Sequence, residues 1–197
     1  SGARCITIGD INNDGTMDAI IGASMGTNTP DGKVHVIDGS DGSTIWIFNP
    51  SGSGNTIGDV SIGNFNGDQY PDVAVACWDD FVYAVDGDTG TELWKRHIGD
   101  IFINSVATAD VNGDGFDDVS YAHEYLAGYD NEIGVLDGTN GMVIWNKTIP
   151  DTAEKTELAD IDDDGSLEAI YGVIKANDEV EVQVRTAISG LLEWSSV

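Results

Sequence analysis

The chain has 197 residues, enough for one domain with a substantial core, and carries 8 basic against 35 acidic side chains, a formal net charge of −27. A field this negative repels phosphate backbones and anionic headgroups, so we expect no nucleic-acid binding and no binding to a membrane surface. No stretch approaches the roughly 20 apolar residues of a membrane span, and 41% hydrophobic residues with five Trp indicate a folded acidic protein without membrane insertion.

The first repeat contains two motifs joined by short β-like runs. An Asp-rich segment, DINNDGTMD, starts at Asp10, and a second motif, DGSDGSTIW, ends at Trp46. Apolar alternation and β-branched residues predict strands around them. The predicted strands are Ile6–Ile8, Ala19–Ala23, Val34–Ile37 and Thr44–Phe48.

Both motifs recur along the chain with the same period. The Asp-rich segment returns as NFNGDQYPD from Asn64, DVNGDGFDD from Asp110 and DIDDDGSLE from Asp160. The second motif returns as DGDTGTELW, DGTNGMVIW and TAISGLLEW, ending at Trp94, Trp145 and Trp194. Two motifs with one period of about 50 residues indicate four structural repeats. Their approximate ranges are 3–50, 57–97, 103–149 and 153–197.

Four antiparallel strands in about 50 residues are typical of a propeller blade. We therefore predict an all-β fold, a single β-propeller domain over residues 1–197 with four four-stranded antiparallel blades. The recurring Trp residues are predicted to pack between blades. Two forms remain open: a closed four-bladed ring, or half of a larger propeller completed by self-association or by further sequence.

Each Asp-rich segment matches a calcium loop, D-x-[DN]-x-D-G-x-x-D. Side-chain oxygens stand at positions 1, 3, 5 and 9, with a backbone carbonyl at position 7, and a Gly at position 6 permits a sharp turn. The predicted ligands are Asp10, Asn12, Asp14, Thr16 and Asp18; Asn64, Asn66, Asp68, Tyr70 and Asp72; Asp110, Asn112, Asp114, Phe116 and Asp118; and Asp160, Asp162, Asp164, Ser166 and Glu168. Up to four Ca²⁺ ions are expected as cofactors.

Ligand charge ranks the loops. The four loops bring three, two, three and four carboxylates in chain order, so the fourth should bind best and the second worst. Gln69 also stands in the second loop where Gly allows the turn most cheaply. The alternative is that these are solvated Asn/Asp/Gly turns, but four such turns in register favour metal loops. An EF-hand is disfavoured because its last ligand is at position 12 and helices flank it.

The loops together with the strand that follows, as in DINNDGTMDAIIGAS, resemble the FG-GAP or VCBS repeats of integrin α-type β-propellers, over all four repeats. The second motif, as in VYAVDGDTGTELW, is similar to quinoprotein-type repeats. That likeness implies blade architecture with a Trp that docks on the next blade, while the groups for a quinone are not recognisable. The integrin-type resemblance also implies that ligands bind on the face away from the metal loops.

Loops of variable length fall on that opposite face, because the metal loops and the DGxxG turns leave the other end of each blade. The variable loops are Ser24–Gly32, Asn49–Asp59, Cys77–Asp80, His97–Asn104 and His123–Asn131. Aromatic loop residues are typical anchors for partners, so a protein or carbohydrate ligand is predicted here. The candidate ligand-binding residues are Trp78, Phe102, His123, Tyr125 and Tyr129.

No spacing turns the His residues into a base–nucleophile pair, so no catalytic residue is predicted. The hypothesis is a non-catalytic, calcium-stabilised binding, adhesion or scaffold module that is extracellular or on the cell surface. The alternative is part of a polysaccharide-degrading, lyase-type propeller enzyme. This alternative is disfavoured because the chain has only eight basic residues, scattered along the sequence, to neutralise an anionic sugar. Cys5 and Cys77 are either a disulfide or two buried thiols.

Overall fold

The computed structural model describes residues 2–24, 32–50, 56–99, 102–123 and 131–196. Within these residues every regular element is a β-strand, and the strands form four separate four-stranded antiparallel sheets, which confirms the predicted all-β blade fold. The described residues include no helix that could cross a membrane.

Each blade is built from four strands that are consecutive in the sequence. The first blade contains β1 (Ala3–Gly9), β2 (Asp18–Ala23), β3 (Val34–Ile37) and β4 (Thr44–Phe48). The second contains β5 (Ile57–Gly63), β6 (Asp72–Cys77), β7 (Phe81–Val85) and β8 (Glu92–His97). The third contains β9 (Ile103–Ala109), β10 (Asp118–His123), β11 (Asn131–Leu136) and β12 (Val143–Ile149). The fourth contains β13 (Thr152–Ala159), β14 (Glu168–Ile174), β15 (Val180–Thr186) and β16 (Leu192–Ser196).

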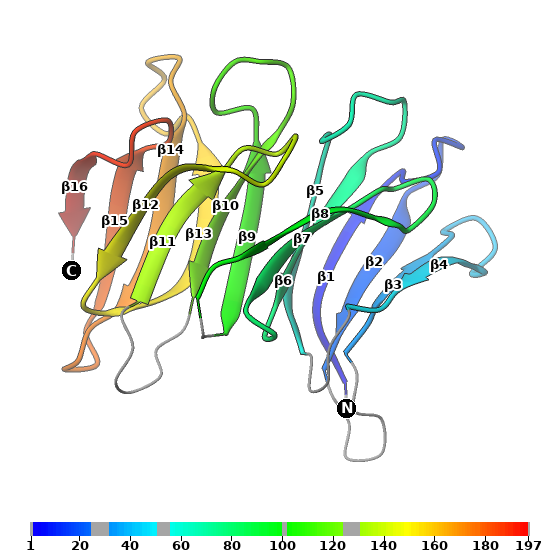
Figure 1. The fold of residues 1–197 in the computed structure, drawn as a ribbon, viewed down its shortest axis with the longest axis horizontal. Helices are drawn as coiled ribbons and strands as arrows, with labels where there is room; N and C mark the ends of the chain where they lie inside the picture. Colours follow the sequence, from blue (N-terminus) through cyan, green and yellow to red (C-terminus); the bar gives the residue numbers. More distant parts are fainter. Residues whose placement is uncertain (1, 25–31, 51–55, 100–101, 124–130, 197) are drawn as a thin grey trace.

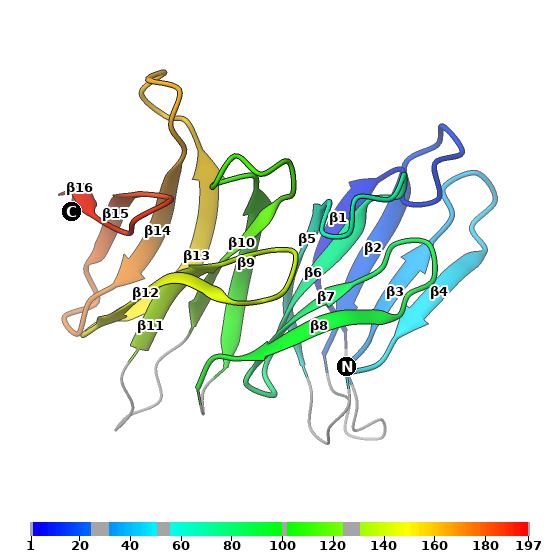
Figure 2. The same ribbon diagram turned by 45° about the horizontal axis from the view of Figure 1, so that its top comes forward.

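The blades stand side by side with their first strands innermost, and β5 packs on both β1 and β9, while β13 packs on β9 (Figures 1 and 2). In both views the first and fourth blades lie at opposite ends of the row. The described blades therefore form an open arc and not a closed four-bladed ring.

The second strand of a blade that has a neighbour on each side is buried on both faces. The strand β6 reads DVAVAC and is buried at every position, because the second blade lies between the first and the third. The inner strands also share polar contacts: Asp59 on β5 accepts hydrogen bonds from Ser105 on β9 and from Lys155 on β13, both at 2.8 Å. These contacts tie the second, third and fourth blades together at the centre of the arc.

The Trp of each second motif docks on the next blade. The indole Nε1 of Trp46 donates to the carbonyl oxygen of Gly87 at 2.7 Å, and Trp94 and Trp145 donate in the same way to Gly138 and Ala187. The predicted packing is therefore confirmed for these three. The prediction is wrong for Trp194, which is 48% exposed against 8% for Trp46, because none of the four described sheets packs on that side of the fourth blade.

The Gly of the DGxxG turn makes this docking possible. Gly90 has φ of +69°, and a Cβ built on it would lie 2.8 Å from the Trp46 ring. A side chain at this position would be strained and would push the indole away.

Cys5 on β1 and Cys77 at the end of β6 are free thiols in this structure. Burial raises the pKa of the Cys5 thiol to about 11 and that of Cys77 further still, so both stay protonated at neutral pH.

Candidate metal centre

The four Asp-rich loops connect the first and second strand of each blade and leave the blades at the same end, the upper end in Figure 1. Within the first loop the carboxylate of Asp10 accepts hydrogen bonds from the amides of Asp14, at 2.9 Å, and Gly15, at 2.8 Å. Asp14 in turn accepts from the amide of Thr16 at 2.7 Å. Backbone donors thus hold the side chains at positions 1 and 5 toward the inside of the loop.

The acid at position 9 is the buried member of each loop. Asp18, Asp72, Asp118 and Glu168 begin the second strand of their blades and are all nearly inaccessible to solvent. Each accepts a hydrogen bond from the amide that follows position 1 of its own loop, as Asp18 does from Ile11 at 3.0 Å. The first three also accept from the Gly of the DG turn, as Asp18 does from Gly39 at 3.0 Å. The buried acid therefore joins the two sequence motifs of its blade.

Burial disfavours the charged form of these acids. Desolvation raises the pKa of Asp118 to about 6, and the nearby Asp114 and Asp137 carboxylates raise it further while two backbone donors lower it. Desolvation likewise raises the pKa of Asp72 and of Glu168. A cation in the loop would favour the charged form of each acid.

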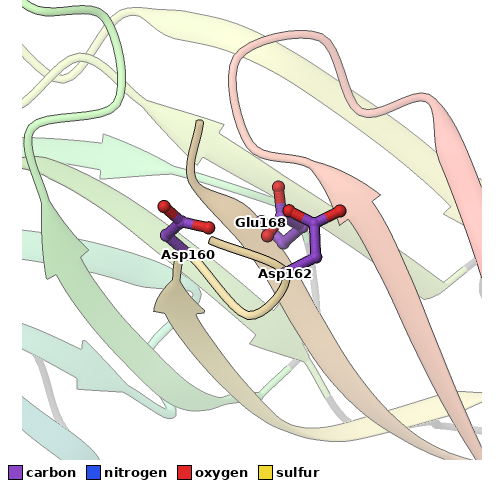
Figure 3. Close-up of side chains that lie close together, drawn as sticks. All are labelled: Asp160, Asp162 and Glu168. Carbon is purple, nitrogen blue, oxygen red and sulfur yellow. The ribbon is translucent and has the colours of Figure 1, made fainter. Parts of the chain in front are cut away.

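Three carboxylates of the fourth loop gather at one point. Asp160, Asp162 and Glu168 each offer an oxygen atom, and these atoms all lie within 4.8 Å of one another (Figure 3). Asp160 and Asp162 are exposed and Glu168 is buried, so the group opens toward solvent on one side. Oxygen-only ligands that gather three negative charges fit a hard divalent cation such as Ca²⁺.

The second loop has a different internal structure. Gly67 adopts a left-handed φ of +74°, and Asn64 accepts a hydrogen bond from its amide at 3.0 Å, whereas Gln69 is absent from the described residues with positive φ. The expectation that Gln69 takes the glycine turn is therefore wrong: all four loops are left-handed at position 4, but only the second lacks a left-handed residue at position 6. The amide nitrogen of Asn66 donates to Asp68 at 3.0 Å and to Asp86 at 3.3 Å, as that of Asn12 does to Asp14 and Asp38 in the first loop.

One acid in each of the first three blades was missed by sequence reasoning. The first Asp of the DGxxG turn approaches the metal loop: Asn12 donates to Asp38 at 3.5 Å, Asn66 to Asp86, and the charge of Asp137 acts on Asp118. The fourth blade has Thr186 at this position. The sequence did contain a signal for this contact: the Asp always opens the DGxxG turn, and this turn lies at the same end of the blade as the Asp-rich loop.

An aromatic cluster lies at the opposite end of the blades. Trp78 and Phe102 stack with ring centroids 4.7 Å apart, and the guanidinium of Arg4 lies 4.3 Å from the centroid of Trp78. The indole of Trp78 donates to Asn104 at 2.9 Å. Arg4, Trp78 and Phe102 come from three different blades, and both rings are half-buried, so each ring keeps part of its surface open to a ligand.

His123 does not belong to an accessible ligand face. It is 1% exposed, and its Nδ1 accepts a hydrogen bond from the amide of Glu132 at 3.4 Å. Its place as the last residue of β10 puts it inside the blade stack, where burial lowers its pKa to about 4. Tyr125 and Tyr129 lie outside the described residues.

Repeated Asp-rich loops on four-stranded blades define a β-propeller with FG-GAP repeats, and the model of the FG-GAP repeat matches residues 6–37. A second family model, PQQ_2, described as outer membrane protein assembly factor BamB, matches residues 22–172, and the chain belongs to this family. A search of the curated proteins found no match.

Two solved structures have the same fold. BamB from Moraxella catarrhalis superposes with a TM-score of 0.58 at 15% identity, over 97% of this chain and 47% of that one. The computationally designed Ika4 protein superposes with a TM-score of 0.61 at 14% identity, over 92% of this chain and 90% of that one. The chain therefore spans about half the length of the BamB structure and nearly the whole length of Ika4.

Proposed function

We propose that the protein is a non-catalytic, calcium-stabilised binding or scaffold module that works outside the cytoplasm. The observation that carries the proposal is the group of three carboxylates in the fourth loop, built at the same position as three further acidic loops. The propeller repeat families to which the chain is similar favour binding or scaffolding over catalysis.

Calcium would act on the ends of the blades. In each loop the side chains at positions 1, 3, 5 and 9 and the carbonyl at position 7 would hold the ion. The ion would neutralise acids that now stand together, and it would fix the connection between the first two strands of the blade. This role is structural, and it leaves the opposite end of the blades for a partner.

The aromatic cluster of Arg4, Trp78 and Phe102 is the surface that we assign to the partner, a protein or a carbohydrate. Half-buried stacked rings are rigid, and they lose little conformational entropy when a ligand covers them. Apolar clusters join the first blade to the second and the second to the third, so the cluster is presented on a packed support.

An extracellular or cell-surface location suits a calcium-stabilised module, because dissociation constants of about 10⁻⁴–10⁻³ M are typical of extracellular calcium-binding modules. The matching family is described as an outer membrane protein assembly factor, which is compatible with work outside the cytoplasm.

The test is calcium titration by calorimetry on chelator-treated protein, together with thermal unfolding. We expect heat of binding, a rise of the melting temperature on adding calcium, and a much smaller rise with magnesium, which demands rigid octahedral geometry. An unchanged melting temperature and no heat of binding would show that the loops are solvated turns.

Absence of catalysis is tested separately, by incubation with pectic or alginate polymers and ultraviolet detection of unsaturated products. A rise in absorbance that depends on the protein would favour the lyase alternative.

A further inference from the structure

Two faces of the chain lack the neighbour that the same faces have elsewhere in the molecule. We define the leading face of a blade as the side that packs on the preceding blade, and the trailing face as the side that packs on the following blade. Three leading–trailing contacts form within the chain, between the first and second, second and third, and third and fourth blades. The leading face of the first blade and the trailing face of the fourth remain open.

The leading face of the first blade is apolar where its counterparts are buried. Ile6 and Ile8 on β1 are 66% and 67% exposed. The residues at the position of Ile6 in the next two blades, Val60 and Val106, are buried against the preceding blade. The Ile8 position in the second blade is Ile62, whose side chain contacts Gly9 of the first blade. The first blade thus presents the surface that the other blades bury.

The trailing face of the fourth blade has the same character. Val182 is exposed, whereas its counterparts Val34, Val82 and Ile133 are completely buried. Ile161 is likewise exposed, whereas Ile11 at the same position is completely buried.

Strand β15 shows an inverted burial pattern. Val180 is 60% exposed while the adjacent Glu181 is 7% exposed and pairs with Lys175. Arg185 is also buried, where it donates to the carbonyl of Gly190. Two buried charged side chains beside the exposed Val180 and Val182 indicate that a neighbour covers the outer face of this part of β15, because water favours the opposite arrangement.

The Trp docking contacts identify what covers these faces. Trp194 is the Trp without a following blade, and the first blade holds the matching acceptor position, the carbonyl of Gly39 beside Gly42. Gly42 has a left-handed φ of +76°, close to the +68° to +70° of Gly90, Gly141 and Gly190, but nothing lies within 4 Å of a Cβ built on it. At each of the other three glycines, a Trp ring of the preceding blade occupies the space beside the Cα atom. One chain therefore carries both an undocked Trp and an empty docking position of the same design.

We propose that two copies of this chain close into one eight-bladed ring, in which the trailing face of each fourth blade packs on the leading face of the other copy's first blade. Trp194 then donates to Gly39 of the second copy and lies over Gly42. A twofold axis along the centre of the ring makes the two new contacts identical and leaves no blade face open. The chain covers about half of the BamB structure, so its four blades have the curvature of half of a propeller twice as long.

The first experiment measures the mass of the 197-residue protein by sedimentation, with calcium present. We expect a species of twice 20.8 kDa that persists on dilution. A single-chain mass at every concentration overturns the proposal, as does an open series of larger species.

Variants then test which faces meet. Ile8→Glu and Val182→Glu should each give single chains with unchanged circular dichroism, because both residues are exposed in the isolated chain. Ile47→Glu is the matched control: Ile47 is also exposed, but its counterparts Lys95 and Asn146 stay exposed even though blades flank them, so this variant should remain paired. Equal loss of pairing in all three variants overturns the assignment of the faces.

Mixing the two disrupted variants gives the sharpest result. A ring with one copy of each variant has one intact contact and one doubly altered contact, so the mixture should associate although neither variant does alone. Failure of the mixture to associate, with both variants folded, overturns the head-to-tail arrangement.

Discussion

Two neighbouring acids of the fourth loop allow the effect of a lost calcium ligand to be distinguished from the effect of a lost charge. Asp162 belongs to the group of three carboxylates, whereas its neighbour Asp163 lies at position 4, with φ of +61°. We expect Asp162→Asn to weaken calcium binding at this loop by at least about tenfold, because one ligand charge in contact with the ion is lost, and a tenfold change corresponds to about 1.4 kcal/mol. Calorimetry on the purified variant measures the effect.

Asp163→Asn is the control for that measurement. It removes the same charge from the same loop, and Asn adopts the left-handed backbone readily. We expect calcium affinity close to that of the unaltered protein. Equal weakening by both variants would mean that the loop responds to net charge and holds no defined ion.

His123 provides a pH-dependent term in stability. Burial lowers its pKa from 6.5 to about 4, so the unfolded chain binds a proton on this group more readily than the folded chain does. The free energy of unfolding is therefore unaffected by this group above pH 6.5. It falls as the pH drops from 6.5 toward 4, by on the order of 3 kcal/mol. Denaturant unfolding of His123→Gln should show a flatter decline across this window than the unaltered protein. Parallel curves would show that His123 does not contribute.

The place of the Asp-rich loops between the first and second strands of each blade could be predicted from the sequence because the spacing of their residues is local. It did not predict that Asp38 and Asp86 approach those loops, since that depends on how the third strand pairs with the second. It also placed His123 on an open face, because position in a loop-like segment does not reveal the depth at which β10 ends. Contacts between strands decide both cases.

In the first three blades, the Trp of the outer strand binds the next blade. Trp46→Ala should lower the free energy of unfolding by about 3–5 kcal/mol, since it empties a buried site and leaves the Gly87 carbonyl without its donor. Ile47→Ala, at the exposed neighbouring position of β4, should cost much less. Urea unfolding of the two variants decides the matter, and similar losses would argue against a docking role for the indole.

Strand positions were well predicted because alternation and turn motifs repeat in every blade. The first-blade expectations Val34–Ile37 and Thr44–Phe48 match β3 and β4. What the pattern did not show was that Trp194 differs from the other three Trp residues. The motif is the same, and the difference arises only from the missing blade beside it.

On the scale of the whole molecule, the charge of −27 opposes compaction. Four Ca²⁺ ions would leave −19, so we expect the calcium-free protein to gain melting temperature with added sodium chloride by screening, and the calcium-loaded protein to gain less. Melting curves at low and high salt, with chelator or with calcium, test this. Equal salt dependence in both states would contradict a calcium-neutralised fold.

The direction of the Trp docking also bears on how the chain is made. Trp46 belongs to the first blade, but the carbonyl that it binds belongs to Gly87, 41 residues later. During synthesis each finished blade therefore keeps its indole in water until the next blade has emerged from the ribosome, and only then is its outer strand secured. We expect the nascent chain to gain order stepwise from the N-terminus, one blade behind the point of elongation, with Trp194 the last indole to be covered.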